Sequence, residues 1–160
     1  MADEIMMAKA KSVLDGVCKM LDAQELKYDR DDEKMFVFLQ ATGEDLPMKF
    51  FFIVKPDVQE LTLYSPMGFK IPEDKRIDTA VAVCVANYGF RIGSFDYDIT
   101  DGEIRFRIAQ SFMDGSLSEN LLETIFLITA NTVDRYNDRF MSLGKGLIDL
   151  QKFIELDKNN

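Results

Sequence analysis

The sequence predicts an α+β fold in which helices pack on one face of an antiparallel five-stranded sheet. Two patterns indicate this class: long segments with helical periodicity lie near both ends of the chain, and short aromatic or β-branched runs lie between them. The composition agrees, because 47% of the 160 residues are hydrophobic and 13 are phenylalanine. Such a chain can bury a core without metals or disulfides. The expected element order is α-β-β-β-α-β-β-α.

The first helix is expected between Ile5 and Leu26. Apolar residues recur there every three or four positions, with lysines and acids on the opposite side. The stripe comprises Met6, Ala10, Val13, Leu14, Val17, Cys18 and Leu21. The acidic run that follows, "DRDDEK" at 29–34, is interpreted as a solvated loop.

Three strands are expected next, at 33–42, 48–55 and 60–65. These segments are rich in aromatic and branched residues, and the turn sequences "GEDLP" and "PDVQ" separate them. The pattern predicts a three-stranded meander.

A second helix should begin at Pro72, because the first turn of a helix does not need the amide proton that proline lacks. It should end near Gly89. The spacing of its apolar residues predicts deep burial of Ile77, Val81, Cys84, Val85 and Tyr88.

A β-hairpin is expected around Asp101 and Gly102, placed as the two central residues of a type I′ turn. This register pairs acids with arginines on one side and apolar residues on the other. The predicted pairs are Asp96 with Arg107, Asp98 with Arg105, Phe95 with Ile108, Tyr97 with Phe106, and Ile99 with Ile104.

The same aspartates could be read as a calcium loop, but their spacing does not fit one. An EF-hand loop needs glycine at position six and a bidentate glutamate at position twelve. Counted from Asp96, those positions hold Asp101 and Arg107. The hairpin explains the acids through their arginine partners, so no metal site is predicted.

The longest helix is expected after Ser116 and Glu119, which are spaced as a capping box, and it should end near Gly144. Its apolar stripe comprises Leu122, Ile125, Phe126, Thr129, Val133, Tyr136 and Phe140. A short amphipathic segment follows. We therefore expect a single domain at 1–146 and a C-terminal amphipathic tail at 147–160.

The composition argues against several functions. The chain has no histidine, which excludes the familiar Ser and Cys triads and the common zinc sites. The carboxylate pairs in the hairpin are explained by strand faces and a turn, so we expect no enzyme, no catalytic residue and no cofactor. A net charge of −9 argues against nucleic acid as a partner.

The chain shows neither a secretory signal pattern nor an apolar run near the roughly 18 residues that span a bilayer. We expect a cytoplasmic protein with no membrane partner. Cys18 and Cys84 lie in apolar contexts and match no metal spacing, so they are predicted to be buried and reduced.

Two of the predicted strands are apolar on both faces. Helices on one side of a sheet cover only one of these faces, and large exposed apolar patches are uncommon on monomers. The other face requires the tail helix, a second subunit or a client segment as its cover, and addition of a peptide to a sheet edge is a further route to a partner. The candidate protein-binding residues are Phe36, Phe38, Phe51, Ile53, Leu147, Leu150 and Ile154.

Three motifs resemble a known family: "IPEDKR", "ANYGFRIGSFDYDITDGEIRFR" and "LSENLLETIF". Together with the element order they resemble the YbjN family of bacterial sensory transduction regulators, over about 13–144. The resemblance implies an antiparallel sheet with helices packed on it, similar to type III secretion chaperones, and no catalytic residues. It implies a non-enzymatic cytoplasmic regulator or protein-binding module. The uncovered apolar face of the sheet separately leads us to expect a homodimer. The alternative is a dimeric secretion-type chaperone that holds an unfolded effector segment.

Overall fold

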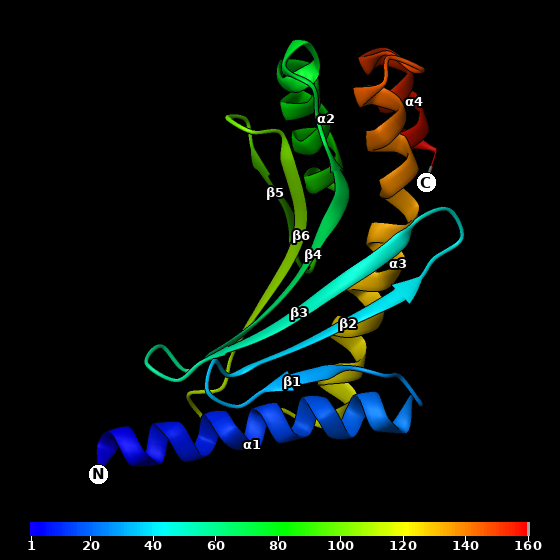
Figure 1. Cartoon of the computed structure of the whole chain (residues 1–160). Coiled ribbons are helices and arrows are strands. Elements are labelled where there is room, and N and C mark those ends of the chain that lie inside the picture. The colour runs from blue at the N-terminus through cyan, green and yellow to red at the C-terminus, as the bar shows by residue number, and fades with distance from the viewer. Residues whose placement is uncertain (160) are drawn as a thin grey trace.

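A computed structural model of the chain describes residues 1–159 (Figure 1). Over these residues the chain forms a six-stranded antiparallel sheet in the order β1-β2-β3-β4-β6-β5. The α+β class is confirmed, whereas the predicted number of five strands is wrong. The elements are α1 (Ala2–Ala23), β1 (Asp29–Asp31), β2 (Phe36–Thr42), β3 (Pro47–Lys55), β4 (Glu60–Lys70), the 3₁₀ turn η1 (Glu73–Lys75), α2 (Arg76–Tyr88), β5 (Ser94–Asp98), β6 (Glu103–Ser111), α3 (Glu119–Gly144) and α4 (Leu150–Lys158).

The additional strand is β1, which lies in the run interpreted as a solvated loop. Its central residue, Arg30, pairs with Val37 of β2. The Arg30 guanidinium reaches α1, where it lies 2.7 Å from a carboxylate oxygen of Asp15 and 3.7 Å from the Sγ of Cys18. Polar contacts therefore stabilise a strand that has no apolar alternation, so hydrophobic periodicity could not predict it.

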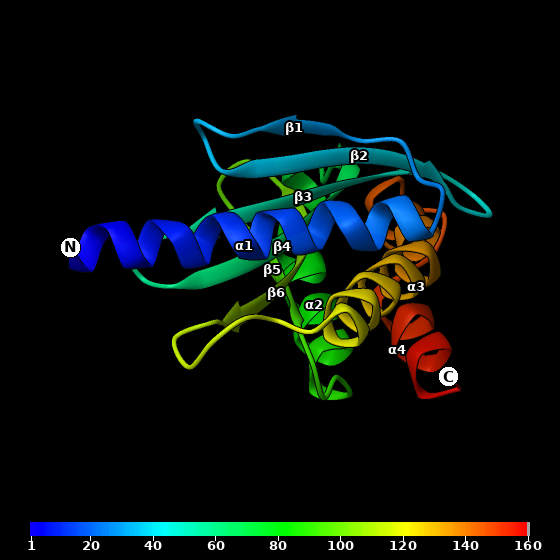
Figure 2. The same cartoon turned by 90° about the horizontal axis from the view of Figure 1, so that it is seen from below.

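The sheet has an inner face, which helices cover, and an outer face. Side chains alternate between these faces along β2 and β3. The inner side chains Val37, Leu39, Phe50 and Phe52 are at most 2% exposed, while their apolar outer neighbours are half-buried. Figure 2 shows α1 crossing the first strands and the start of α3.

The long helix α3 buries the stripe that its sequence predicts. All seven stripe residues are buried, and the ring of Phe126 lies 5.0 Å from that of Phe50 in β3. The helix ends at Gly144 as expected, but the predicted cap at Ser116 is wrong. Ser118 caps the helix instead, accepting a hydrogen bond from the Leu121 amide at 3.2 Å.

The second helix lies where it was predicted but presents the opposite side to the core. Small residues face inward, namely Thr79, Ala82, Val83 and Ala86. The predicted buried stripe is largely solvent-facing: Ile77 is 69% exposed, Val81 43% and Tyr88 95%, and Cys84 is also exposed. Only Val85 of that stripe is half-buried. Small side chains allow close packing of α2 on α4 and β5, which turns the larger ones outward.

The predicted hairpin forms from β5 and β6, but its turn and register differ from those predicted. Asp98 pairs directly with Glu103, so the connecting loop is 99–102 rather than the pair Asp101 and Gly102. Each strand residue meets a partner two positions from the predicted one. Because side chains alternate with a period of two, this shift leaves every side chain on its predicted face.

The C-terminal segment packs on the helical side of the molecule. Phe153 of α4 is fully buried, with its ring 5.1 Å from that of Phe140 in α3. The Tyr136 hydroxyl donates a hydrogen bond to Asp157. Burial, followed by this carboxylate, raises the pKa of Tyr136 to about 12. The division into a domain at 1–146 and a tail at 147–160 stays a prediction.

Candidate functional site

Four of the predicted binding residues lie together on the outer face of the sheet. Phe36 pairs with Ile53 and Phe38 with Phe51, across the ladder between β2 and β3. The rings of Phe38 and Phe51 are 4.9 Å apart and tilted by 36°. All four side chains are half-buried, and they are separate from the partly buried side chains that pack against the main core. We call these four residues the outer-face cluster.

Charged and aromatic residues border this cluster on both sides. On β1, Asp29 pairs with Phe38 and Asp31 with Phe36, which places carboxylates along one edge. On β4, Tyr64 pairs with Phe51, and the guanidinium of Arg105 lies 4.4 Å from the centre of the Tyr64 ring. The outer face therefore carries carboxylates beside the cluster on β1, and an aromatic ring with an adjacent guanidinium beside it on β4.

The far end of the outer face carries a charged group on the hairpin. Asp96 accepts a hydrogen bond from Arg107 at 2.8 Å and lies 3.4 Å from Arg105. The Asp96 carboxylate raises the pKa of Arg107 further above its usual range. The predicted contact between Asp96 and Arg107 is confirmed, although Asp96 pairs in register with Arg105.

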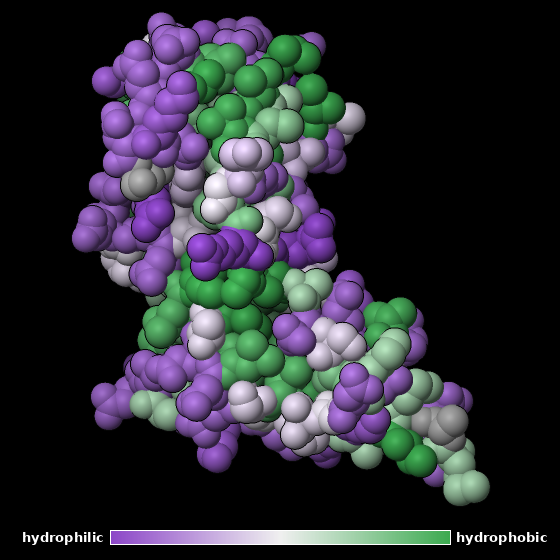
Figure 3. All heavy atoms as spheres, turned by 180° about the vertical axis from the view of Figure 1, so that it is seen from behind, coloured by the Kyte–Doolittle hydropathy of each residue, from purple (hydrophilic) through white to green (hydrophobic). Residues whose placement is uncertain are grey.

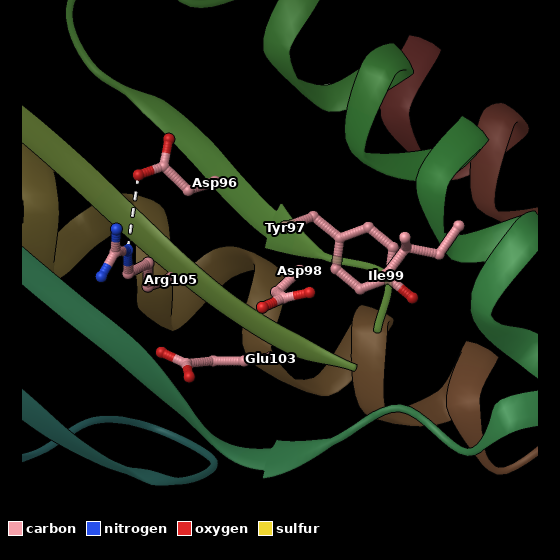
Figure 4. A pocket seen from close by; sticks show the side chains of 6 residues that line it. All are labelled: Asp96, Tyr97, Asp98, Ile99, Glu103 and Arg105. Atoms are coloured by element: carbon pink, nitrogen blue, oxygen red, sulfur yellow. Dashed lines mark hydrogen bonds and ion pairs between the residues drawn. The ribbon is translucent and has the colours of Figure 1, made fainter. Parts of the chain in front are cut away.

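A hollow of about 400 Å³ lies over this end, between the carboxylates of β5 and β6 (Figure 4). Asp98 and Glu103 project from neighbouring strands, while Tyr97 and Ile99 extend toward α2. The Thr100 hydroxyl and then its amide donate to Asp98 and lower the pKa of that carboxyl. The predicted contact between Asp98 and Arg105 is replaced by these bonds, because the loop is longer than a two-residue turn.

The tip of the hairpin is fixed to the end of β4. Lys70 forms an ion pair with Asp101, and this ammonium, with the Glu103 amide, lowers the pKa of the Asp101 carboxyl. Gly102 adopts φ +82°, and its carbonyl accepts a hydrogen bond from the Ile71 amide at 2.9 Å. The acidic residues of the loop thus serve to hold the loop itself.

This arrangement suits structure better than acid–base chemistry. A general acid in a protein has a raised pKa, whereas the pKa of Asp98 and that of Asp101 are both lowered. Within the described part of the chain, no group of three or more metal-ligating side chains could hold an ion.

The other predicted binding residues lie elsewhere. Leu147 is 73% exposed in the segment before α4, and Leu150 and Ile154 are half-buried on α4 itself. This helix packs on α2 and α3. The structure therefore separates the three tail residues from the outer-face cluster. Of the cysteines, Cys18 is buried as predicted, while the prediction for Cys84 is wrong because the inner side of α2 carries the smaller residues.

Sequence reasoning missed the role of Asn87 at the edge of the sheet. Its side-chain amide donates to the carbonyl of Phe95 at 3.0 Å and accepts from the Phe95 amide at 2.7 Å. These are edge groups of β5, the outermost strand beside β6. Asn87 thus blocks strand addition at this position of the edge. An asparagine two positions before the glycine that ends a helix could have signalled a side chain that bonds nearby backbone groups.

Fold and surface together define a class: an α+β protein with helices on one face of its sheet and an aromatic cluster on the other. Residues 14–141 match the sequence profile of YbjN, a family described as "Putative bacterial sensory transduction regulator". The chain belongs to the YbjN family, as its motifs predict.

A solved structure shares this fold. The crystal structure of YbjN from E. coli, described as "a putative transcription regulator", aligns with a TM-score of 0.56 at 12% sequence identity. The alignment covers 76% of this chain and 85% of that chain. No curated protein matches the chain. The expected likeness to type III secretion chaperones stays a prediction.

Among the described helices, none has both the length and the apolar content needed to cross a bilayer.

Proposed function

We propose that this chain is a non-enzymatic regulator of the bacterial cytoplasm, and that it acts by binding a protein partner through the outer face of its sheet. The observation that carries this proposal is the outer-face cluster. Its four apolar side chains lie side by side on a face that none of the described helices covers. Family membership supports the regulatory role, because the YbjN family is described as a sensory transduction regulator.

The free energy of burying apolar side chains favours binding of a partner over the outer-face cluster. Fully burying a large apolar side chain contributes about 1.5–3 kcal/mol. Each member of the cluster is already half-buried, so completing its burial contributes roughly 1 kcal/mol. Four such side chains, with the adjacent ring of Tyr64, are enough to anchor a small interface.

The charges around the cluster indicate the chemistry of the partner. Asp29 and Asp31 lie beside the cluster on β1, and the chain carries a net charge of −9. A segment that inserts apolar side chains between basic residues fits this surface, because opposite charges at the rim increase the association rate and orient the partner. A strongly acidic segment would be repelled at the β1 edge.

Affinity capture from the native cell tests the proposal. The wild-type chain is compared with a double variant, Phe38→Thr with Phe51→Thr, in which β-branched residues preserve strand propensity. A matched control is Leu127→Gln on α3, where the native side chain is 45% exposed and distant from the sheet's outer face. Circular dichroism verifies that all three proteins fold.

We expect one protein to be captured by the wild type and by the control but lost with the double variant. Equal recovery with all three proteins would overturn the outer face as the binding surface. Limited proteolysis of the captured protein separates the two candidate roles. A folded, protease-resistant partner supports a regulator, while an extended, protease-sensitive segment supports the secretion-type chaperone.

A further inference from the structure

A second apolar surface lies on α2, on the helical side of the molecule. Ile77, Val81, Cys84 and Tyr88 recur at the spacing of one helix face. All four are exposed, and we call them the α2 stripe. Figure 3 shows a hydrophobic patch over α2, bordered by hydrophilic surface. The opposite side of α2 packs against α3, α4 and β5, so residues 1–159 leave the stripe exposed.

The patch extends beyond the helix. Ile99, in the hairpin loop, is 43% exposed, and Ile92, just after α2, is 47% exposed. Arg76 connects α2 to this loop, because its guanidinium donates to the Thr100 carbonyl at 2.8 Å. The hydrogen bond from Arg76 therefore fixes the hairpin loop that carries Ile99 to the N-terminal end of α2.

Charges are distributed unequally along α2. Exposed acids lie at its N-terminal end, namely Glu73, Asp74 and Asp78. The exposed Arg91 follows its C-terminal end. A helix of this kind complements a second copy of itself in the antiparallel direction, where acid meets base and the two helix dipoles oppose each other.

We propose that two copies of the chain pair through the α2 stripe, antiparallel about a two-fold axis between Val81 and Cys84. In this arrangement Ile77 contacts the partner's Tyr88 and Val81 contacts the partner's Cys84. Asp74 then lies beside the partner's Arg91. The same residues serve both subunits, which is the defining property of a two-fold interface. This inference is independent of the proposed function, because it uses the side of the molecule away from the outer face.

The size of the contact sets the expected affinity. The 13 residues of α2 extend over about 20 Å at 1.5 Å per residue. One helix pair with flanking isoleucines falls at the low end of the range for specific interfaces. The dimer should therefore dissociate on dilution, with a dissociation constant between about 1 and about 100 μM.

Light scattering across a concentration series provides the first test. Val81→Glu places two like charges close to the axis and should raise the dissociation constant more than about 100-fold. The matched control is Leu127→Glu, because Leu127 is 45% exposed and Val81 is 43% exposed. Thermal unfolding verifies that both variants fold. A wild-type monomer at every concentration, or equal weakening by both variants, would overturn the inference.

The native thiols provide a second test, which needs no substitution. Cys84 is exposed and near the axis, whereas Cys18 is buried. A short bis-maleimide should link the two Cys84 side chains of a dimer and leave Cys18 unmodified. The crosslink should disappear with Val81→Glu. Its absence from a wild-type dimer would show that the copies meet through another surface.

A charge exchange tests the direction of pairing. Asp74→Arg alone should weaken the dimer, and adding Arg91→Asp should restore it, because each contact then has the opposite polarity. If the double variant is no tighter than the single variant, antiparallel pairing is wrong.

Discussion

Replacing Gly102 by alanine should destabilise the fold strongly, although the substitution adds only one methyl group. Gly102 adopts φ +82°, and a Cβ built there would lie 2.2 Å from the Ile71 oxygen and 2.8 Å from the Ile71 nitrogen. Both atoms are backbone atoms, so neither can move without displacing the end of β4. The loop must shift, which breaks the hydrogen bond from the Ile71 amide to the Gly102 carbonyl.

The magnitude follows from these contacts. A left-handed conformation costs an alanine about 1–2 kcal/mol, and the lost hydrogen bond costs about 1 kcal/mol. The smaller entropy of the unfolded alanine chain offsets about 0.5 kcal/mol. We expect Gly102→Ala to lower the free energy of unfolding by about 1.5–2.5 kcal/mol.

Urea denaturation at neutral pH measures this change. With an m-value near 2 kcal/mol/M, the midpoint should fall by about 0.8–1.2 M. The control is Gly68→Ala in β4, where an added Cβ meets no atom within 4 Å and the change should be within about 0.5 kcal/mol. Equal midpoints for the two variants would refute the close approach of the hairpin loop to Ile71.

Further predictions concern the sheet edge and the C-terminal helix. Asn87→Ala should lower the free energy of unfolding by about 1–3 kcal/mol, because both edge groups of Phe95 lose their partner; an unchanged urea midpoint would contradict this. Phe153→Ala should cost about 3–5 kcal/mol in one cooperative transition, whereas a separate early transition would show that 147–160 is an independent tail. Tyr136→Phe should be less stable than the wild type below pH 10, because it lacks the bond to Asp157. That difference should shrink between pH 10 and about 12, since the raised pKa of Tyr136 favours its neutral form in the fold; a constant difference in chemical denaturation would contradict it.

The sequence predicted those parts of the fold that depend on one dominant pattern. The stripe of α3 was fully confirmed because its seven members recur at helical spacing along one side of the helix. The strands β2 and β3 were confirmed because aromatic and branched residues are concentrated there. Their apolar character on both faces also predicted the four residues of the outer-face cluster.

The errors occurred where two physical effects compete. On α2, small and large apolar residues form two stripes, and hydropathy favours the larger residues although close packing selects the smaller ones. In the hairpin, Asp and Gly have the composition of a tight turn, but contacts of Lys70 and Ile71 with the loop stabilise a wider connection. On β1, the polar contacts of Arg30 depend on α1, which lies outside any local window of sequence.

The tail residues show that an amphipathic pattern predicts a helix but not the surface on which the helix packs. Leu147, Leu150 and Ile154 form an amphipathic pattern, but Leu147 is exposed and only the other two are half-buried. The pattern does not say which surface the helix packs on. Phe153, which was not among the predicted binding residues, carries the contact with Phe140 in α3.

Site-specific photo-crosslinking in the native cell tests the central claim most directly. Benzoylphenylalanine replaces Phe38 in one variant and Leu127 in another, so that the same reactive ketone lies on the outer face or on α3. We predict a discrete protein adduct from position 38 that is absent from position 127. No adduct at position 38, or the same adducts from both positions, would contradict a partner-binding role for the outer face of the sheet.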